Sequence, residues 1–294
     1  MKLYAIVEIP GKGKGMVAAT RILVGKRILR DAPAVTLFPG ESVFTKTFST
    51  SALDLANIYP EIPQEFGIYK TNAIQRYQGS NISDLCVRIS RCNHSCRPNA
   101  VYSWCNELNE KVLHAIRPIE KDEEITVQYK NPSRDFDSDM KVLDETFQFR
   151  CACSICSNVT PEYKKKYKQY LQLVDSILQY PRDVKKGFIY CMESISLIQE
   201  LGFGVTELQL RLYDLFQIYV SVRDVKNAKV AVKAVLEINK IQFGDNGCDE
   251  ENYKLYLVDP SKHPLFGVCD SARVVLDSIS DAFCEEIVGK CCVA

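Results

Sequence analysis

The sequence predicts an α+β protein with a mainly β first half and an α-helical second half. Before about residue 130, apolar residues fall in short runs bounded by glycine, proline and asparagine, which is typical of strands joined by turns. After residue 160 they recur every three to four positions over long stretches, as in amphipathic helices. A cysteine cluster at residues 151–156 separates the two patterns. With 294 residues, the chain is long enough for two packed units.

The β half begins with a strand at residues 3–9, where Leu3, Ala5, Val7 and Ile9 alternate with their neighbours and Pro10-Gly11 ends the run. A glycine-rich turn follows, before the next extended segment begins at Val17. Turn-forming residues separate the later segments, so we expect short strands and few long helices. These further extended segments are residues 17–20, 27–30, 100–105, 111–116 and 124–129.

The helical half begins at Thr160-Pro161-Glu162, which supplies a capping hydroxyl, a first-turn proline and a first-turn acid. Paired helices of this length resemble tetratricopeptide repeats, although no clean period emerges, so we predict a TPR-like domain. It either supports the first half or binds a protein partner. Helical spacing is found over residues 163–178, 188–202, 208–219, 225–244 and 274–287.

The charge balance argues against direct nucleic-acid binding, because 37 basic residues face 37 acidic ones and neither half is strongly positive. No apolar run reaches the ~18 residues that span a bilayer, and the first residues do not read as a secretory signal. We therefore expect a soluble protein without membrane association, in the cytoplasm, the nucleus or both. Its 13 cysteines are expected to be reduced, some of them bound to metal.

Residues 91–100 (Arg-Cys-Asn-His-Ser-Cys-Arg-Pro-Asn-Ala) are unusually polar for core material. Asparagine and histidine in a tight turn can grip a polar cofactor, whereas a lone histidine would more simply mark a surface loop. The second reading weakens because two more motifs follow. Residues 122–129 form an acidic turn that enters a strand and ends in Tyr129, and residues 149–156 contain a C-x-C-x₂-C pattern.

Together with the glycine motif at residues 11–18, these ordered segments resemble the SET-domain protein-lysine methyltransferases. The SET and MYND branch and its fungal relatives are the most similar, but residues 37–70 contain no cysteine, so the MYND zinc finger is absent. The resemblance implies a SET catalytic domain at residues 1–149 and a zinc-binding tail at residues 150–160. A helical TPR-like domain would follow at residues 161–294.

The resemblance also implies S-adenosylmethionine as cofactor. The glycine motif would bring backbone groups against it, whereas a nucleotide-binding loop would lead into a helix, and strand-like sequence follows here. Lys14 would pair with the cofactor's carboxylate. Asn93 would bind its amino-acid end, His94 would contact the adenine through its backbone, and Phe149 would cover the adenine face. The implied cofactor-binding residues are Lys14, Gly15, Met16, Asn72, Asn93, His94 and Phe149.

The tail cysteines Cys151, Cys153 and Cys156 lie too close together for ordinary disulfides among themselves. A tetrahedral zinc needs a fourth ligand, which the resemblance places at Cys96, with Cys92 and Cys105 as nearby alternatives. A Cys₄ site leaves no open coordination position, so the zinc would be structural.

Tyr129 is the predicted catalytic residue, since the family has a tyrosine at this place that orients the reacting amine. Phe147 stands where relatives often place a second tyrosine of the lysine channel, so we expect this channel to admit a more methylated lysine. The predicted function is methyl transfer to the ε-amine of lysine in a protein or peptide substrate, histone or non-histone. The alternative is a catalytically inactive SET scaffold that binds protein partners through its helical domain.

Overall fold

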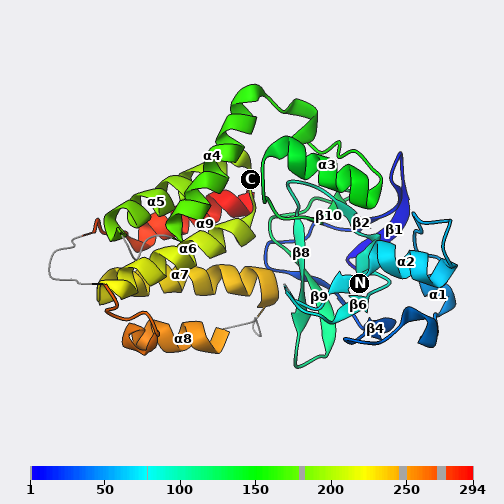
Figure 1. Ribbon diagram of the computed structural model, residues 1–294, viewed down its shortest axis with the longest axis horizontal. Coiled ribbons are helices and arrows are strands. Elements are labelled where there is room, and N and C mark those ends of the chain that lie inside the picture. The colour runs from blue at the N-terminus through cyan, green and yellow to red at the C-terminus, as the bar shows by residue number, and fades with distance from the viewer. Residues whose placement is uncertain (1, 78, 179–182, 245–249, 270–275, 294) are drawn as a thin grey trace. The chain divides into compact units, whose positions relative to one another are not determined.

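The computed structural model describes residues 2–77, 79–178, 183–244, 250–269 and 276–293 (Figure 1). The chain forms two compact units. One comprises Met1–Tyr129 with Met140–Cys151, and the other Lys130–Asp139 with Ala152–Ala294. The first unit contains all the β-strands found in the described residues, and the second contains a run of long helices, so the predicted α+β class is confirmed.

A four-stranded sheet of order β1-β2-β10-β7 carries the motifs of the first unit. The β1–β2 hairpin turns at residues 10–12, and β2 already begins at Gly13, whereas the sequence analysis began the next extended segment only at Val17. Gly15 pairs with Val7 as an ordinary strand residue. The pairing of β10 with β7 is parallel, and the other two pairings are antiparallel. The bounds are β1 Tyr4–Ile9, β2 Gly13–Ala18, β7 Asn93–His94 and β10 Glu124–Val127.

Two three-stranded sheets complete the β structure, in the orders β3-β9-β8 and β4-β6-β5. Their strands are β3 Arg27–Asp31, β4 Val35–Leu37, β5 Ile74–Gln75, β6 Ser83–Leu85, β8 Ala100–Cys105 and β9 Glu110–Ala115. Helices that the sequence analysis did not anticipate lie between the strands and after them. They are α1 Thr50–Leu53, α2 Gln64–Asn72 and α3 Phe136–Phe147, with 3₁₀ turns at Val43–Thr45 and Ile89–Arg91.

The helical unit is built from consecutive helices that pack on one another (Figure 1). Hydrogen bonds from the chain to cap side chains fix the helix starts at Thr160, Asp183 and Asp224, and Gly202 ends α5 in the left-handed conformation. No helix in the described residues is long and apolar enough to cross a membrane. The bounds are α4 Pro161–Ile177, α5 Val184–Leu201, α6 Val205–Ser221, α7 Val225–Phe243, α8 Glu250–Val258 and α9 Asp281–Val293.

The last predicted helix, residues 274–287, is helical only from Asp281. Residues 274 and 275 lie outside the described residues, and residues 276–280 are in neither a helix nor a strand. Ser280 explains the later start, because its hydroxyl accepts a hydrogen bond from the backbone N–H of Phe283, as an N-cap does. The prediction was therefore too long at its beginning.

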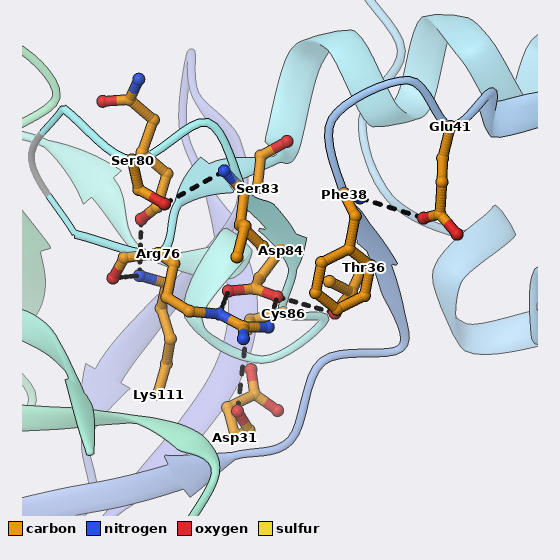
Figure 2. Close-up of polar contacts among 12 residues, drawn as sticks. Asp31, Thr36, Phe38, Glu41, Arg76, Ser80, Ser83, Asp84, Cys86 and Lys111 are labelled. Atoms are coloured by element: carbon orange, nitrogen blue, oxygen red, sulfur yellow. Dashed lines mark hydrogen bonds and ion pairs between the residues drawn. The ribbon is translucent and has the colours of Figure 1, made fainter. Parts of the chain in front are cut away.

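A buried polar network lies beside β6 in the first unit (Figure 2). The Asp84 carboxylate is fully buried and accepts two hydrogen bonds from the Arg76 guanidinium, at 2.7 and 3.0 Å. It accepts a third from the Thr36 hydroxyl at 2.7 Å. The Arg76 guanidinium lies 3.9 Å from the centre of the Trp104 ring. These contacts compensate for the burial of both charges.

Lys111 of β9 is also buried, and its ammonium lies 5.4 Å from the centre of the Tyr102 ring, but no salt bridge to it is found among the described residues. Its side chain is 1% exposed, and its ammonium donates hydrogen bonds to two uncharged groups, the carbonyl oxygens of Gln75 at 2.7 Å and Arg76 at 2.9 Å (Figure 2). Burial lowers the pKa of Lys111 to about 8, because it disfavours the charged form.

Replacing Lys111 with methionine is expected to flatten the pH dependence of stability above pH 8. Between pH 8 and 10.5, the unfolded chain holds a proton on this amine that the folded chain has already released. The wild-type free energy of unfolding should therefore rise with pH relative to the variant, by on the order of 3 kcal/mol over that window. Urea unfolding near pH 7.5 and pH 10 measures this difference. Substitution of the exposed Lys121 by methionine should leave the pH dependence unchanged, and parallel wild-type and Lys111→Met curves would contradict the expectation.

Candidate active site

The Asn93–His94 segment is held beside β10 by the register of the sheet. Asn93 pairs with Thr126 and His94 with Val127, in a parallel arrangement. The Asn99 side chain strengthens this join, because its amide nitrogen donates to the Glu124 carbonyl at 2.7 Å and its oxygen accepts from the Thr126 N–H at 2.8 Å. The end of β10 and the polar segment therefore form one rigid surface.

Tyr129 lies two residues beyond the end of β10 and is tied back to the same segment. Its hydroxyl donates to the carbonyl oxygen of Cys92 at 2.7 Å, and its backbone N–H donates to His94 Nδ1 at 3.1 Å. Burial raises the pKa of the Tyr129 phenol well above its usual value. The hydroxyl therefore stays protonated at neutral pH and can act as a hydrogen-bonding group, but not as a base.

The His94 ring is fully engaged within the protein. Since a backbone N–H can only donate, Nδ1 is the acceptor, and the neutral ring carries its proton on Nε2. Nε2 lies 3.4 Å from Cys96 Sγ. The side chain is thus occupied on both nitrogens, and a ligand can reach His94 through its backbone.

Three rings surround that of Tyr129. The centroid of its ring lies 5.0 Å from that of Phe147, 5.4 Å from that of His94 and 6.3 Å from that of Phe149. The His94 and Phe149 centroids are 5.9 Å apart. Phe147 ends α3, and Gln148 adopts a left-handed conformation with φ of 55°, which turns the chain so that Phe149 joins the same cluster. The cluster surrounds the tyrosine with apolar, polarisable faces.

Gly15 and Met16 lie in β2 beside the Asn93 segment. A Cβ on Gly15 would lie 2.5 Å from Ile9 Cγ1 and 2.8 Å from Asn93 Nδ2, so any other residue would displace the asparagine. Met16 is fully buried, opposite Ile125 of β10. Only its backbone can therefore meet a ligand.

Lys14 points to a carboxylate within the protein. Its ammonium lies 2.7 Å from an Asp54 carboxylate oxygen, which also accepts from the Arg91 guanidinium at 2.7 Å. The Lys14 hydrogen bond, together with Arg91, holds the pKa of the Asp54 carboxyl below its usual value. Asp54 is exposed, so this bridge contributes little and leaves Lys14 free to exchange to another carboxylate.

Asn72 is the last residue of α2, and its side-chain nitrogen is used internally. Nδ2 donates to the carbonyl oxygens of Ala56 at 2.6 Å and Ile68 at 2.8 Å, and the Asn72 carbonyl accepts from the Ser90 hydroxyl. If Asn72 contacts a cofactor as predicted, it would do so through its side-chain oxygen, Oδ1.

Four cysteines gather at the start of the tail, and they are the four that the sequence analysis named. The sulfurs of Cys96, Cys151, Cys153 and Cys156 all lie within 4.8 Å of one another, and the first two are 3.9 Å apart. Tetrahedral zinc with Zn–S bonds of about 2.3 Å needs sulfurs separated by about 3.8 Å, so the donor set fits this metal. The alternative ligands lie elsewhere, with Cys92 buried against Met16 and Cys105 buried at the end of β8.

Sequence reasoning missed one charged contact at this site. It gave Glu124 no role at the site, whereas the carboxylate of Glu124, the first residue of β10, accepts from Asn93 Nδ2 at 2.8 Å and from Lys12 Nζ at 2.6 Å. No motif spacing links these residues, because they come together only through the strand register.

Comparison with known proteins identifies the core that carries this site. Residues 13–130 match the SET domain family. The chain therefore contains a SET domain. This confirms the resemblance found in the sequence. The matched region includes the glycine strand, the Asn93 segment and Tyr129, so the candidate site lies within or directly beside the SET domain.

This chain is similar in sequence to three relatives, over different shares of its length. It is 27% identical over 90% of its length to histone-lysine N-methyltransferase set5 of Schizosaccharomyces pombe, and covers 86% of that protein. It is 35% identical over 33% of its length to histone-lysine N-methyltransferase ASHR1 of Arabidopsis thaliana. It is 40% identical over 27% of its length to protein-lysine N-trimethyltransferase SMYD5 of Mus musculus. It covers 21% of each of these two. The similarity to set5 therefore includes the helical half, and the other two similarities are confined to a shorter stretch.

Proposed function

We propose that the ring cluster around Tyr129 is the place where a substrate lysine receives a methyl group. The SET-domain assignment and relatives named for this activity make the chain a protein-lysine N-methyltransferase. The observation that carries the proposed site is the Tyr129 hydroxyl. It is fixed on the Cys92 carbonyl, kept protonated and surrounded by rings beside the Asn93–His94 segment.

SET-domain methyltransferases use S-adenosylmethionine, which supplies a methyl group on a positively charged sulfur when bound. In this chain, the rigid surface of β2 and the Asn93–His94 segment would hold its amino-acid end and adenine. Lys14 would exchange from Asp54 to the cofactor's carboxylate, and Phe149 would cover the adenine. The proposed contacts are those of the sequence analysis, namely Lys14, Gly15, Met16, Asn72, Asn93, His94 and Phe149.

Tyr129 would aim the lysine amine. A free lysine is protonated at neutral pH, with a pKa near 10.4, so it must lose its proton before it can attack. A channel lined by Tyr129 and Phe147 would favour the neutral amine by excluding water. The tyrosine hydroxyl would then orient the amine in line with the methyl group, and alignment supplies most of the rate.

The four clustered cysteines would bind one structural zinc ion, tying the tail to the Asn93 segment through Cys96. We keep the domain limits proposed from the sequence, with a catalytic domain at 1–149, a zinc-binding tail at 150–160 and a TPR-like domain at 161–294. The helical domain remains the proposed site for a protein partner.

The substrate is a lysine in a protein, and the histone substrates named for the relatives make a histone the first candidate, with a nuclear or cytoplasmic location. Non-histone proteins are the second, because SMYD5 is named for protein lysine without mention of histones. The inactive-scaffold alternative has no observation in its favour.

Phe147 is expected to set the degree of methylation. It lies against Tyr129 and has no hydroxyl to anchor an unmethylated amine or a water molecule, so we expect the channel to admit a more methylated lysine. Replacing Phe147 with tyrosine should shift the main product toward monomethyl-lysine, by about tenfold in the ratio of mono- to trimethyl product. Mass spectrometry of a methylated peptide measures the ratio. An unchanged product ratio in an active variant would exclude Phe147 from this role.

The proposed function is tested by two measurements on the zinc-loaded protein. Isothermal titration with S-adenosylhomocysteine should show one site per chain. Transfer of labelled methyl groups to histones and to a proteome extract, followed by site mapping, should identify the lysine. No binding of S-adenosylhomocysteine would overturn the assignment, and binding without transfer to any protein would favour the scaffold alternative.

A further inference from the structure

The Glu124 carboxylate contacts both the β1–β2 turn and Asn93, two segments beside the proposed cofactor site. One oxygen accepts from Asn93 Nδ2 at 2.8 Å, and the other accepts from Lys12 Nζ in the β1–β2 turn at 2.6 Å. Its side chain is 20% exposed, while that of Lys12 is 41% exposed. The Asn93 contact is the more sheltered of the two, and it is the contact that can direct a ligand-binding group.

The strand register places Glu124 next to Asn93 without adjustment. Asn93 pairs with Thr126, and Glu124 stands two residues earlier on β10, so its side chain lies on the same face of the sheet as that of Thr126. Asn99 fixes the β10 backbone at both of these residues, through the Glu124 carbonyl and the Thr126 N–H. The sheet therefore holds the Glu124 backbone in place whether or not a ligand is bound.

A carboxylate decides which way the Asn93 amide faces. Carboxylate oxygens only accept hydrogen bonds, so the amide must turn its NH₂ toward Glu124 and its oxygen away. Gly15 lies directly beside this hydrogen bond, because a Cβ there would lie 2.8 Å from Asn93 Nδ2 and 3.3 Å from the Glu124 oxygen. The amide is thus held by Glu124 and packed against β2 in a single orientation.

We propose that Glu124 is a positioning residue for the cofactor. By accepting from Asn93 Nδ2, it presents the Asn93 amide oxygen as an acceptor for the ammonium group of an α-amino acid, which is the end of S-adenosylmethionine that this segment would bind. The inference rests on the proposed function and adds to it a residue that contacts no cofactor atom itself. Hydrogen bonding, not charge, is the property that Glu124 contributes.

Two substitutions at Glu124 separate the effect of its hydrogen bond to Asn93 from the effect of its charge. Glu124→Gln keeps an oxygen that accepts from Asn93 and loses only the exposed ion pair with Lys12, which contributes little. Its Kd for S-adenosylhomocysteine should stay within about threefold of wild type. Glu124→Ala removes the acceptor, and its Kd and its KM for S-adenosylmethionine should rise by about tenfold to a hundredfold. The KM for the lysine substrate should change less, because the hydrogen bonds of the Glu124 carboxylate go to Asn93 and Lys12 and not to Tyr129.

A double-mutant cycle with Asn93 tests whether Glu124 acts through the amide. Once Asn93 is alanine, Glu124→Ala should weaken cofactor binding no further. Glu110→Ala is the matched control, since Glu110 is 22% exposed and pairs with Arg30 at 2.8 Å on another sheet. Thermal midpoints of both alanine variants show whether loss of an exposed carboxylate alone destabilises the fold.

The outcomes distinguish this inference from the proposed function. A wild-type protein that does not bind S-adenosylhomocysteine would overturn the function. If wild type binds, three results would each overturn the positioning role: Glu124→Ala binding as tightly as wild type, Glu124→Gln binding as weakly as Glu124→Ala, or additive losses in the cycle. Rescue by glutamine with no added loss in the Asn93→Ala background is the result expected.

Discussion

Replacing Tyr129 with phenylalanine is expected to reduce methyl transfer by at least about a hundredfold while leaving cofactor affinity near that of wild type. The ring would keep its contacts with Phe147, His94 and Phe149, whose centroids lie 5.0 to 6.3 Å away. Only the hydroxyl is lost. It is the one group in this cluster that can hold an amine by hydrogen bonding and that stays protonated at neutral pH, because burial raises its pKa.

The same substitution leaves the Cys92 carbonyl without its 2.7 Å partner, so a modest loss of stability, of about 1 kcal/mol, is expected as well. Tyr69→Phe is the matched control, because its hydroxyl donates to the Ser83 carbonyl at 2.8 Å elsewhere in the same unit. That variant should show a similar loss of stability and retain its activity. Single-turnover transfer and titration with S-adenosylhomocysteine measure both effects. Substantial turnover by Tyr129→Phe would remove Tyr129 from the mechanism.

The sequence predicted the elements whose signals are local. Alternation at residues 3–9 marked β1, and the capping hydroxyl of Thr160 marked the start of α4, as the structure confirms. Helix α3 was missed although Phe136, Met140, Leu143 and Phe147 recur at helical spacing, so its signal was present and overlooked. The two-residue strands β5 and β7 show no periodicity, and only pairing with distant neighbours makes them strands.

At the site, too, local motifs could be predicted from the sequence and contacts between distant segments could not. The residues that motif order named as the zinc ligands lie together, and Asn93, His94 and Tyr129 converge because β7 runs beside β10. The Glu124 contacts with Asn93 and Lys12 could not be predicted, since they depend on which residues stand opposite one another in the sheet. Asp54 likewise meets Lys14 from a helix 40 residues away in the chain.

Replacing Cys153 with serine is expected to abolish zinc binding and to destabilise the protein by several kcal/mol. Purified wild-type protein should contain about one zinc per chain, because four thiols within 4.8 Å of one another form a closed tetrahedral donor set. With one thiolate lost, the three remaining sulfurs cannot complete the tetrahedral site. Because zinc binds the folded protein and not the unfolded chain, losing the metal lowers the free energy of unfolding. Atomic absorption and thermal unfolding measure the two effects. Cys105→Ser, outside the cluster, should keep both the metal and the stability.

Loss of the metal is also expected to disturb the position of the catalytic Tyr129 under conditions in which the protein stays folded. His94 contacts Cys96 through Nε2 at 3.4 Å and holds the Tyr129 backbone through Nδ1 at 3.1 Å, so the ring links a zinc ligand to the catalytic residue. A metal-bound thiolate accepts a hydrogen bond from Nε2 better than a free thiol does, and such outer contacts orient the groups around a metal. Mild chelation at a temperature where the fold persists should therefore lower the transfer rate, with recovery on zinc addition. Carefully purified protein that is active, stable and free of metal would refute the zinc assignment, and activity unaffected by chelation in a folded, metal-depleted protein would refute the link through His94.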